Sequence, residues 1–230
     1  MGNEIYEKLI KGYTEKQWGR DCKALPVCIM KRIPIRFVYD NNYFSEPFQG
    51  IPKGGYTSII EKMLSKADVI LNTNYITDRE KFKKYAKKII YTGPIDEYYG
   101  SKYGALQYRS LRFETEILDE ENAQGVAVVN YTDKETPFTR SIEHKHFEFG
   151  TQPYTVITKE YPLEWKPGIE AYYPINDSVN NQRYAAYQKE AQKEKDLYFA
   201  GRLGAYMYTD MQDTVKSALK LWDKISEENR

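Results

Sequence analysis

The sequence is short of the features that mark several common classes of protein. Its two cysteines, Cys22 and Cys28, are too few for a disulfide framework and lack the C-x-x-C spacing of redox and zinc motifs. No apolar run approaches the roughly 20 residues that a membrane span needs. The formal net charge of +1 gives no bulk positive field for nucleic acid or an anionic membrane. Residues 1–13 carry charges where a secretory signal has its apolar core, so we predict a cytoplasmic chain.

Glycine is present, but not in a pattern that binds nucleotides. The sequence has no G-x-G-x-x-G and no P-loop, and Gly54 and Gly55 precede a predicted helix without the strand that a phosphate loop needs. No G-x-S-x-G elbow supports Ser-His-Asp catalysis, and neither cysteine has the local signature of a nucleophile. The residues by themselves therefore indicate neither a nucleotide fold nor a hydrolase.

Tyrosine is the residue that stands out, with 22 copies. Tyrosine combines a rigid apolar face with a hydroxyl donor, which suits a polar ligand such as a sugar or a nucleotide, but it also suits a tyrosine-rich core. Arginine matches phosphate oxygens with its planar fork, so arginines near tyrosines could hold a diphosphate; surface ion pairs and core tyrosines are the alternative. The candidates are Arg32, Arg140, Tyr43, Tyr172, Tyr173, Tyr206 and Tyr208.

The pattern of apolar residues and turn signals predicts a mixed α/β chain. Helices are expected at 4–13, with Gly12 as its stop, and at 57–64, 78–86, 177–195 and 210–225. Short strands are expected at 69–71, 88–91 and 197–200. Four β-rich runs, at 106–117, 126–131, 138–149 and 154–160, predict an antiparallel sheet. Residues 18–55 are rich in Pro and Gly and are predicted to be loops.

Two histidines deserve a separate test as metal ligands. His144 and His146 alternate on a predicted strand, which would point both rings to one face. No third ligand is apparent nearby, so we interpret them as surface or network histidines and predict no metal site.

Ten strings, together and in order, resemble UDP-galactopyranose mutase. They are GYTEKQWG at 12–19, DNNYF at 40–44, QGIPKGGY at 49–56, YTGPID at 91–96, YRSLRFE at 108–114, VNYTD at 129–133, TRSIEHKHF at 139–147, TKEYP at 158–162, YYP at 172–174 and GRL at 201–203. The resemblance implies interconversion of UDP-galactopyranose and UDP-galactofuranose on reduced FAD. In that family, flavin N5 attacks the anomeric carbon, UDP leaves and later returns, and no net redox change occurs.

The resemblance also implies roles for individual residues. Arg32 and Arg140 match the family's two diphosphate arginines, which would hold the leaving UDP. Its phosphate-contacting tyrosines correspond to Tyr43, Tyr173 and Tyr208. The remaining substrate contacts are the uracil-stacking Tyr13, the substrate-lining Trp18 and the nucleotide contact Asn130. The stretch that touches the flavin corresponds to Gly201, Arg202, Asp210 and Met211.

One departure from the family is large, because the Gly-rich FAD fingerprint is absent from these residues. The resemblance therefore implies a helical, mobile substrate segment at 1–65, a mainly β substrate wall at 66–196, and a strand and helix at 197–230 that complete a Rossmann-like FAD domain. A non-catalytic nucleotide-sugar binding fragment or partner subunit is the alternative function. A homodimer and a separate N-terminal FAD-binding chain are both open as partners; nucleic acid and a membrane are not expected.

Overall fold

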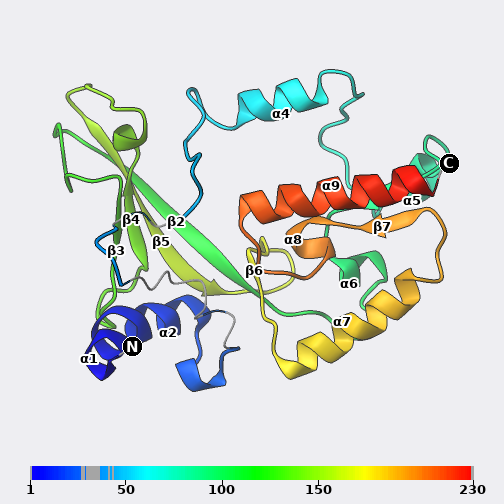
Figure 1. Ribbon diagram of the computed structural model, residues 1–230, viewed down its shortest axis with the longest axis horizontal. Helices are drawn as coiled ribbons and strands as arrows, with labels where there is room; N and C mark the ends of the chain where they lie inside the picture. Colours follow the sequence, from blue (N-terminus) through cyan, green and yellow to red (C-terminus); the bar gives the residue numbers. More distant parts are fainter. Residues whose placement is uncertain (1, 27–28, 30–36, 41, 43, 229–230) are drawn as a thin grey trace. The chain divides into compact units, whose positions relative to one another are not determined.

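The computed structural model describes residues 2–26, 29, 37–40, 42 and 44–228. The chain forms two compact units, each made of two stretches of sequence: unit 1 is Met1–Leu71 with Arg112–Pro162, and unit 2 is Asn72–Leu111 with Leu163–Arg230. The predicted mixed α/β fold with an antiparallel sheet is confirmed (Figure 1). The functional division at residues 65 and 196 stays a prediction.

Unit 1 begins with one continuous helical segment. It consists of α1 (Asn3–Ile5), a π-helical stretch η1 (Tyr6–Lys11) and α2 (Gly12–Trp18), and a 3₁₀ turn η2 (Cys22–Ala24) follows. Gly19 ends the segment in the left-handed conformation, with φ 63°. The predicted stop at Gly12 is wrong: a Cβ there would lie 2.1 Å from the Thr132 carbonyl oxygen, so this glycine permits close packing instead of ending the helix.

The larger sheet has the strand order β3-β4-β5-β2-β6. Its strands are β2 (Tyr108–Leu118), β3 (Val128–Asn130), β4 (Arg140–Glu143), β5 (Thr155–Glu164) and β6 (Tyr173–Pro174). All four predicted β-rich runs therefore contain a strand, and β3 with β4, β4 with β5, and β2 with β6 pair antiparallel. Unit 1 also contains α4 (Thr57–Leu64), at the predicted position.

Unit 2 is built around a parallel pair of short strands, β1 (Ile89–Tyr91) and β7 (Leu197–Phe199). Its helices are α5 (Arg79–Phe82), α6 (Ile95–Tyr98), α7 (Ser178–Ala191), α8 (Gly201–Gly204) and α9 (Met211–Glu227), and α9 runs beside β7 and α8 (Figure 1). Asp177, where the predicted helix was expected to begin, caps α7, since its side chain accepts from the Asn180 backbone NH. The buried core consists of Ile95, Leu106, Tyr108, Tyr187 and Tyr206.

Two predicted strands differ from the structure. Residues 69–71 are not a strand: Val69, Ile70 and Leu71 are 54%, 64% and 76% exposed, because an apolar triplet forms a strand only when another strand supplies its hydrogen bonds. The run at 138–149 is a strand only over β4, after which a 3₁₀ helix η3 (His144–Phe147) begins. Among the helices that the structure describes, none is long and apolar enough to cross a bilayer.

Candidate functional site

Three polar side chains form one row across the strands of unit 1. Arg140 on β4 lies directly opposite Asn130 on β3 and Glu160 on β5. Residues directly opposite each other in antiparallel strands point to the same face of the sheet, so all three side chains share one face. The sheet register thereby brings together Arg140 and Asn130, which the resemblance assigned to the diphosphate and the nucleotide.

The arginine of this row is held by a buried acid. Arg140 Nε donates to Glu160 Oε2 at 2.5 Å, and the two side chains are 34% and 8% exposed. This contact fixes one edge of the guanidinium, and the partly exposed position lets the cation face a ligand on the surface. Asn130 is exposed beside it. The arrangement is suited to binding an anion that combines a phosphate with a group able to hydrogen-bond an amide.

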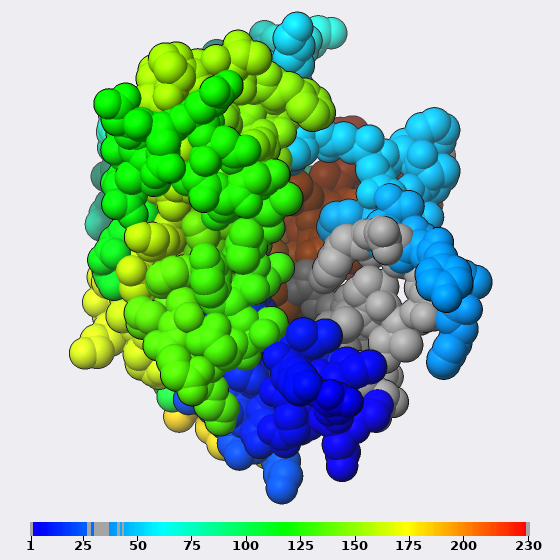
Figure 2. Space-filling view, turned by 90° about the vertical axis from the view of Figure 1, so that its left-hand side faces the viewer, coloured from blue at the N-terminus to red at the C-terminus, as the bar shows by residue number. Residues whose placement is uncertain are grey.

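The two aromatic residues assigned to the substrate lie on α2, in the same unit. Tyr13 is half-buried, and Trp18 at the end of the helix is 5% exposed. In Figure 2 the N-terminal helices, in dark blue, lie directly against the green surface of the sheet segment. Their roles in stacking on uracil and lining the substrate stay predictions. Arg32 and Tyr43, the other residues assigned to this part of the chain, lie outside the described residues.

A second cluster lies in unit 2 and joins two predicted substrate tyrosines to a predicted flavin residue. The Arg202 guanidinium lies 5.8 Å from the ring centre of Tyr173 and 5.2 Å from that of Tyr208, within cation–π range. The two rings meet edge to face, with centres 5.2 Å apart. Arg202 also donates to the carbonyl oxygens of Tyr172 and Thr209. A cation and two phenol rings are thus held at fixed positions in one place.

The remaining residues of the predicted flavin stretch surround the start of α8 and α9. Gly201 follows β7 with φ 73°, a backbone conformation that residues other than glycine rarely adopt. Asp210 is the N-cap residue of α9, and Met211 beside it is 65% exposed. A cavity of about 160 Å³ is lined by Phe199, Ala200, Gly201, Ala205, Met207, Thr209, Thr214, Ser217 and Leu221. The stretch therefore forms a small, partly polar hollow in unit 2.

One candidate tyrosine is structural. Tyr206 is 1% exposed, and its hydroxyl lies 2.6 and 2.8 Å from the carbonyl oxygens of Gln107 and Ile175. Burial raises the pKa of this phenol well above its usual range. Tyr206 joins Tyr98, Tyr108 and Tyr187 in the core. Part of the tyrosine-rich composition therefore belongs to the core.

The two histidines do not share a face. The expectation that they alternate on a strand is wrong, because His144 and His146 lie in the 3₁₀ helix η3, where residues two apart point in different directions. His144 Nε2 lies 2.7 Å from the Thr158 hydroxyl, and His146 Nε2 lies 3.1 Å from a Glu143 oxygen. In the described part of the chain, no group of three or more His, Cys, Asp or Glu side chains could hold a metal ion.

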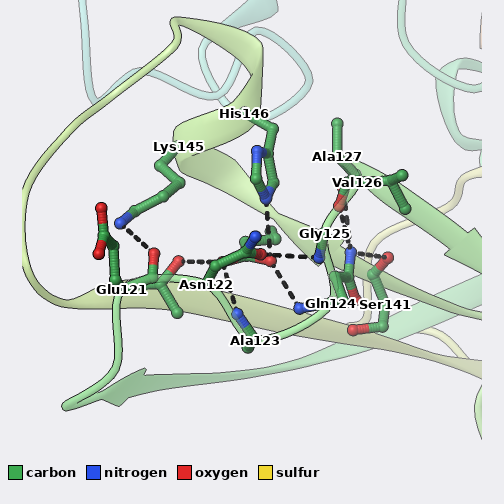
Figure 3. Close-up of polar contacts among 12 residues, drawn as sticks. Glu121, Asn122, Ala123, Gln124, Gly125, Val126, Ala127, Ser141, Lys145 and His146 are labelled. Atoms are coloured by element: carbon green, nitrogen blue, oxygen red, sulfur yellow. Dashed lines mark hydrogen bonds and ion pairs between the residues drawn. The ribbon is translucent and has the colours of Figure 1, made fainter.

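Glu143, at the end of β4, is fully buried and accepts bonds from the loop before β3, whose residues 121–127 are labelled in Figure 3. Burial by itself would raise the pKa of its carboxyl, but bonds from the Thr155 hydroxyl and the backbone NH groups of Ala123 and Gln124, with His146 nearby, lower it to about 2. The Lys145 ammonium donates to the carbonyl oxygens of Glu121 and Gln152 in the same region. This network fastens the loop to the sheet.

Sequence reasoning missed Glu160. The acid lies 20 positions from Arg140, a separation with no local periodicity, and only the register of two strands places them opposite each other. The cation–π position of Arg202 was missed for the same reason, since Tyr173 and Tyr208 come from a strand and a loop on either side of α7. The only signal in the sequence was the family-like string around each residue, and such a string does not say which side chains contact each other.

Comparison with known proteins assigns the chain to a family. A family model described as "GLF: UDP-galactopyranose mutase" matches residues 8–208. The chain is 40% identical to a probable UDP-galactopyranose mutase of Klebsiella pneumoniae over 97% of its own length and 58% of that protein. It is 33% identical to a dTDP-fucopyranose mutase of Escherichia coli, over 96% of this chain and 60% of that one.

A third relative agrees with the first. The UDP-galactopyranose mutase of Mycoplasma genitalium is 32% identical over 96% of this chain and 59% of its own length. The chain thus spans well under two thirds of each of these curated relatives. With a family match that covers most of its residues, the chain belongs to the UDP-galactopyranose mutase family.

Proposed function

We propose that this chain supplies the nucleotide-sugar binding part of a mutase that interconverts UDP-galactopyranose and UDP-galactofuranose with reduced FAD. The observation that carries the proposal is the row of Asn130, Arg140 and Glu160 on one face of the sheet. A buried acid that fixes a partly exposed arginine beside an exposed amide is an arrangement suited to a nucleoside diphosphate.

Arg140 has a role that follows from its charge. When UDP leaves the sugar, negative charge grows on the diphosphate, and charge-assisted bonds from the guanidinium strengthen as it grows. Because Glu160 holds Nε at 2.5 Å, the guanidinium does not have to be ordered during the reaction. The same contact keeps the cation in place to retain the departed UDP until it returns to the sugar.

The Arg202 cluster supports the same proposal from unit 2. Phenol hydroxyls of Tyr173 and Tyr208 can donate to phosphate or sugar oxygens, and a cation against both rings restricts their orientation. Arg202, which the resemblance assigns to the flavin, would also position these two tyrosines. If substitution of Arg202 lowers the affinity for FAD, the flavin contacts this residue; if it lowers the affinity for UDP, the substrate does.

The residues around Gly201 fit part of a flavin cofactor. The left-handed turn allows close backbone approach, and the hydroxyls of Thr209, Thr214 and Ser217, each hydrogen-bonded within the chain, line the hollow. The hollow of about 160 Å³ is smaller than the 300–1,000 Å³ typical of ligand pockets, so these residues would hold one edge of the cofactor. Reduced FAD, when bound, would supply the nucleophile for the anomeric carbon. Gly201, Arg202, Asp210 and Met211 would orient it.

Two other functions compete with this one. The similarity to a dTDP-fucopyranose mutase favours dTDP-fucopyranose as an alternative substrate. A non-catalytic nucleotide-sugar binding partner would keep the Arg140 row but need no flavin. The three functions are separated by measuring turnover of each nucleotide sugar under reducing and oxidising conditions. The family's FAD-binding part is present in the same chain or added. The proposal requires turnover of UDP-galactofuranose only when the flavin is reduced.

The direct test is titration calorimetry of UDP into the protein. We compare wild type with Arg140→Gln combined with Glu160→Gln, which removes the guanidinium without leaving a buried carboxylate unpaired. The expected loss of UDP affinity is roughly 10- to 100-fold, equivalent to about 1.4–3 kcal/mol for charge-assisted bonds.

Arg112→Gln is the matched control. Arg112 also lies on the sheet in unit 1, and its side chain is 50% exposed and paired with Glu114, outside the row. UDP affinity should stay within about twofold of wild type, since exposed pairs contribute little. Equal affinity in all three proteins, or no UDP binding by wild type at millimolar concentration, refutes the proposal.

A further inference from the structure

Lys16 lies outside every role assigned so far, yet it makes an unusually complete set of contacts. Its ammonium donates to three backbone carbonyl oxygens, those of Tyr131, Thr136 and Phe138, at 2.9, 3.0 and 3.1 Å. Three donors thus meet three acceptors, which satisfies a half-buried ammonium without a carboxylate partner. Burial lowers the pKa of Lys16, against the opposing effect of Asp133 and Glu135. The carbonyls all belong to the turn 131–138 that joins β3 to β4.

Two further contacts attach the same helix to the same turn. Gly12, one helical turn before Lys16, lies so close to Thr132 that an added Cβ would be 2.1 Å from its carbonyl oxygen. Glu15 pairs with Lys134 at 2.7 Å, and this bond lowers the pKa of the Glu15 carboxyl. The contacts at positions 12, 15 and 16 together cover one side of α2. The helix is therefore fastened along its length to the turn.

This turn is continuous with the candidate diphosphate row. Asn130 immediately precedes it, Arg140 follows it, and the Tyr131 NH donates to the Thr139 carbonyl at 2.9 Å to close the hairpin. On the other side of the contact, Tyr13 lies on α2 between Gly12 and Lys16. A displacement of α2 from the turn would change the distance between Tyr13 and the pair Asn130 and Arg140.

We propose that Lys16 is a positioning residue that sets the spacing between the base-binding helix face, at Tyr13, and the diphosphate row at Asn130 and Arg140. The inference rests on the proposed function, because it takes these residues as contacts of one nucleotide. The lysine does not touch the ligand. Its Nζ binds three carbonyl oxygens of the turn at once, so that α2 and the β3–β4 hairpin move as one body.

The other end of the same hairpin provides a matched control. There, Glu143 holds the loop before β3 through the Thr155 hydroxyl and two backbone NH groups. Lys16 and Glu143 are both charged groups with several hydrogen-bond partners, Lys16 at the turn of the hairpin and Glu143 at its other end, but Glu143 has no contact with α2 among the described interactions. Loss of either should loosen the hairpin, and only loss of Lys16 should separate it from α2.

The experiment measures UDP affinity by calorimetry for Lys16→Met, Lys16→Gln and Glu143→Gln, well below the melting temperature of each. We expect about a tenfold loss for Lys16→Met, a smaller loss for Lys16→Gln, which retains an amide donor, and a change within twofold for Glu143→Gln. Melting temperatures should fall for all three. If Lys16→Met does not fold, the UDP affinity of Lys16→Gln alone tests the inference.

Two results would overturn the inference, and they are distinguishable. If the Arg140 and Glu160 double variant loses affinity while both Lys16 variants bind UDP like wild type, the spacing role is wrong and the proposed function stands. If wild type itself does not bind UDP, both are wrong. A loss for Glu143→Gln as large as for Lys16→Met would also refute a specific role, because hairpin stability alone would then explain it.

Discussion

Removing the members of the Arg140 and Glu160 pair one at a time should show how firmly the guanidinium is held. The two side chains differ in burial: Glu160 is 8% exposed and Arg140 is 34% exposed. Arg140→Gln leaves an acid buried without its cation, whereas Glu160→Gln leaves a cation that can still reach water. The structure therefore predicts unequal costs for two substitutions that break the same contact.

The magnitudes follow from this difference. Breaking a buried pair by removing one partner costs about 3–5 kcal/mol, and the partial exposure of Arg140 places Arg140→Gln near the lower end, at about 3 kcal/mol. Glu160→Gln should cost about 1 kcal/mol, as for a hydrogen bond weakened at a partly exposed group. The double variant removes both charges and should cost only about 2 kcal/mol, so the coupling energy is about 2 kcal/mol.

Native-state hydrogen exchange of peptides covering β4 and β5 measures these values, since it reports the free energy of opening of this part of unit 1. A double-mutant cycle then compares the two single variants with the double variant. Additivity within about 0.5 kcal/mol would refute the coupling. A larger cost for Glu160→Gln than for Arg140→Gln would refute the burial argument, and with it the claim that Glu160 orients the arginine.

Three further predictions concern other parts of the fold. The pKa of Glu143 is lowered to about 2 in the folded protein. The stability that its charge contributes should therefore be complete above about pH 4.3 and lost as the pH falls toward 2. The melting temperature of Glu143→Gln should decline less on acidification than that of wild type. Gly12→Ala should destabilise the protein by about 1–3 kcal/mol despite the better helix propensity of alanine, since its Cβ would meet the Thr132 carbonyl at 2.1 Å; a raised melting temperature would contradict this. Replacing His144 and His146 together by Gln should leave UDP affinity insensitive to added or chelated zinc, and a zinc effect on wild type that the double variant lacks would count against our interpretation of these rings.

Local sequence determined a good part of the secondary structure. Asp177 is a good N-cap, and α7 begins directly after it; β-branched and aromatic runs became strands, and α4 lies at the predicted residues. These features depend on groups a few residues apart, so a short window contains the physical cause. The ten ordered strings likewise indicated the family, which the match over residues 8–208 confirms.

Tertiary structure alone decided the rest. Gly12 reads as a helix stop, yet the approach of Thr132, 120 residues away along the chain, gives it a packing role. Strand register, fixed by hydrogen bonds between β3, β4 and β5, put Asn130, Arg140 and Glu160 in one row. Lys16 meets its carbonyls only because α2 lies on the β3–β4 turn. Such pairings depend on contacts between distant segments, whose free energy belongs to the assembled fold and leaves no periodic trace in the sequence.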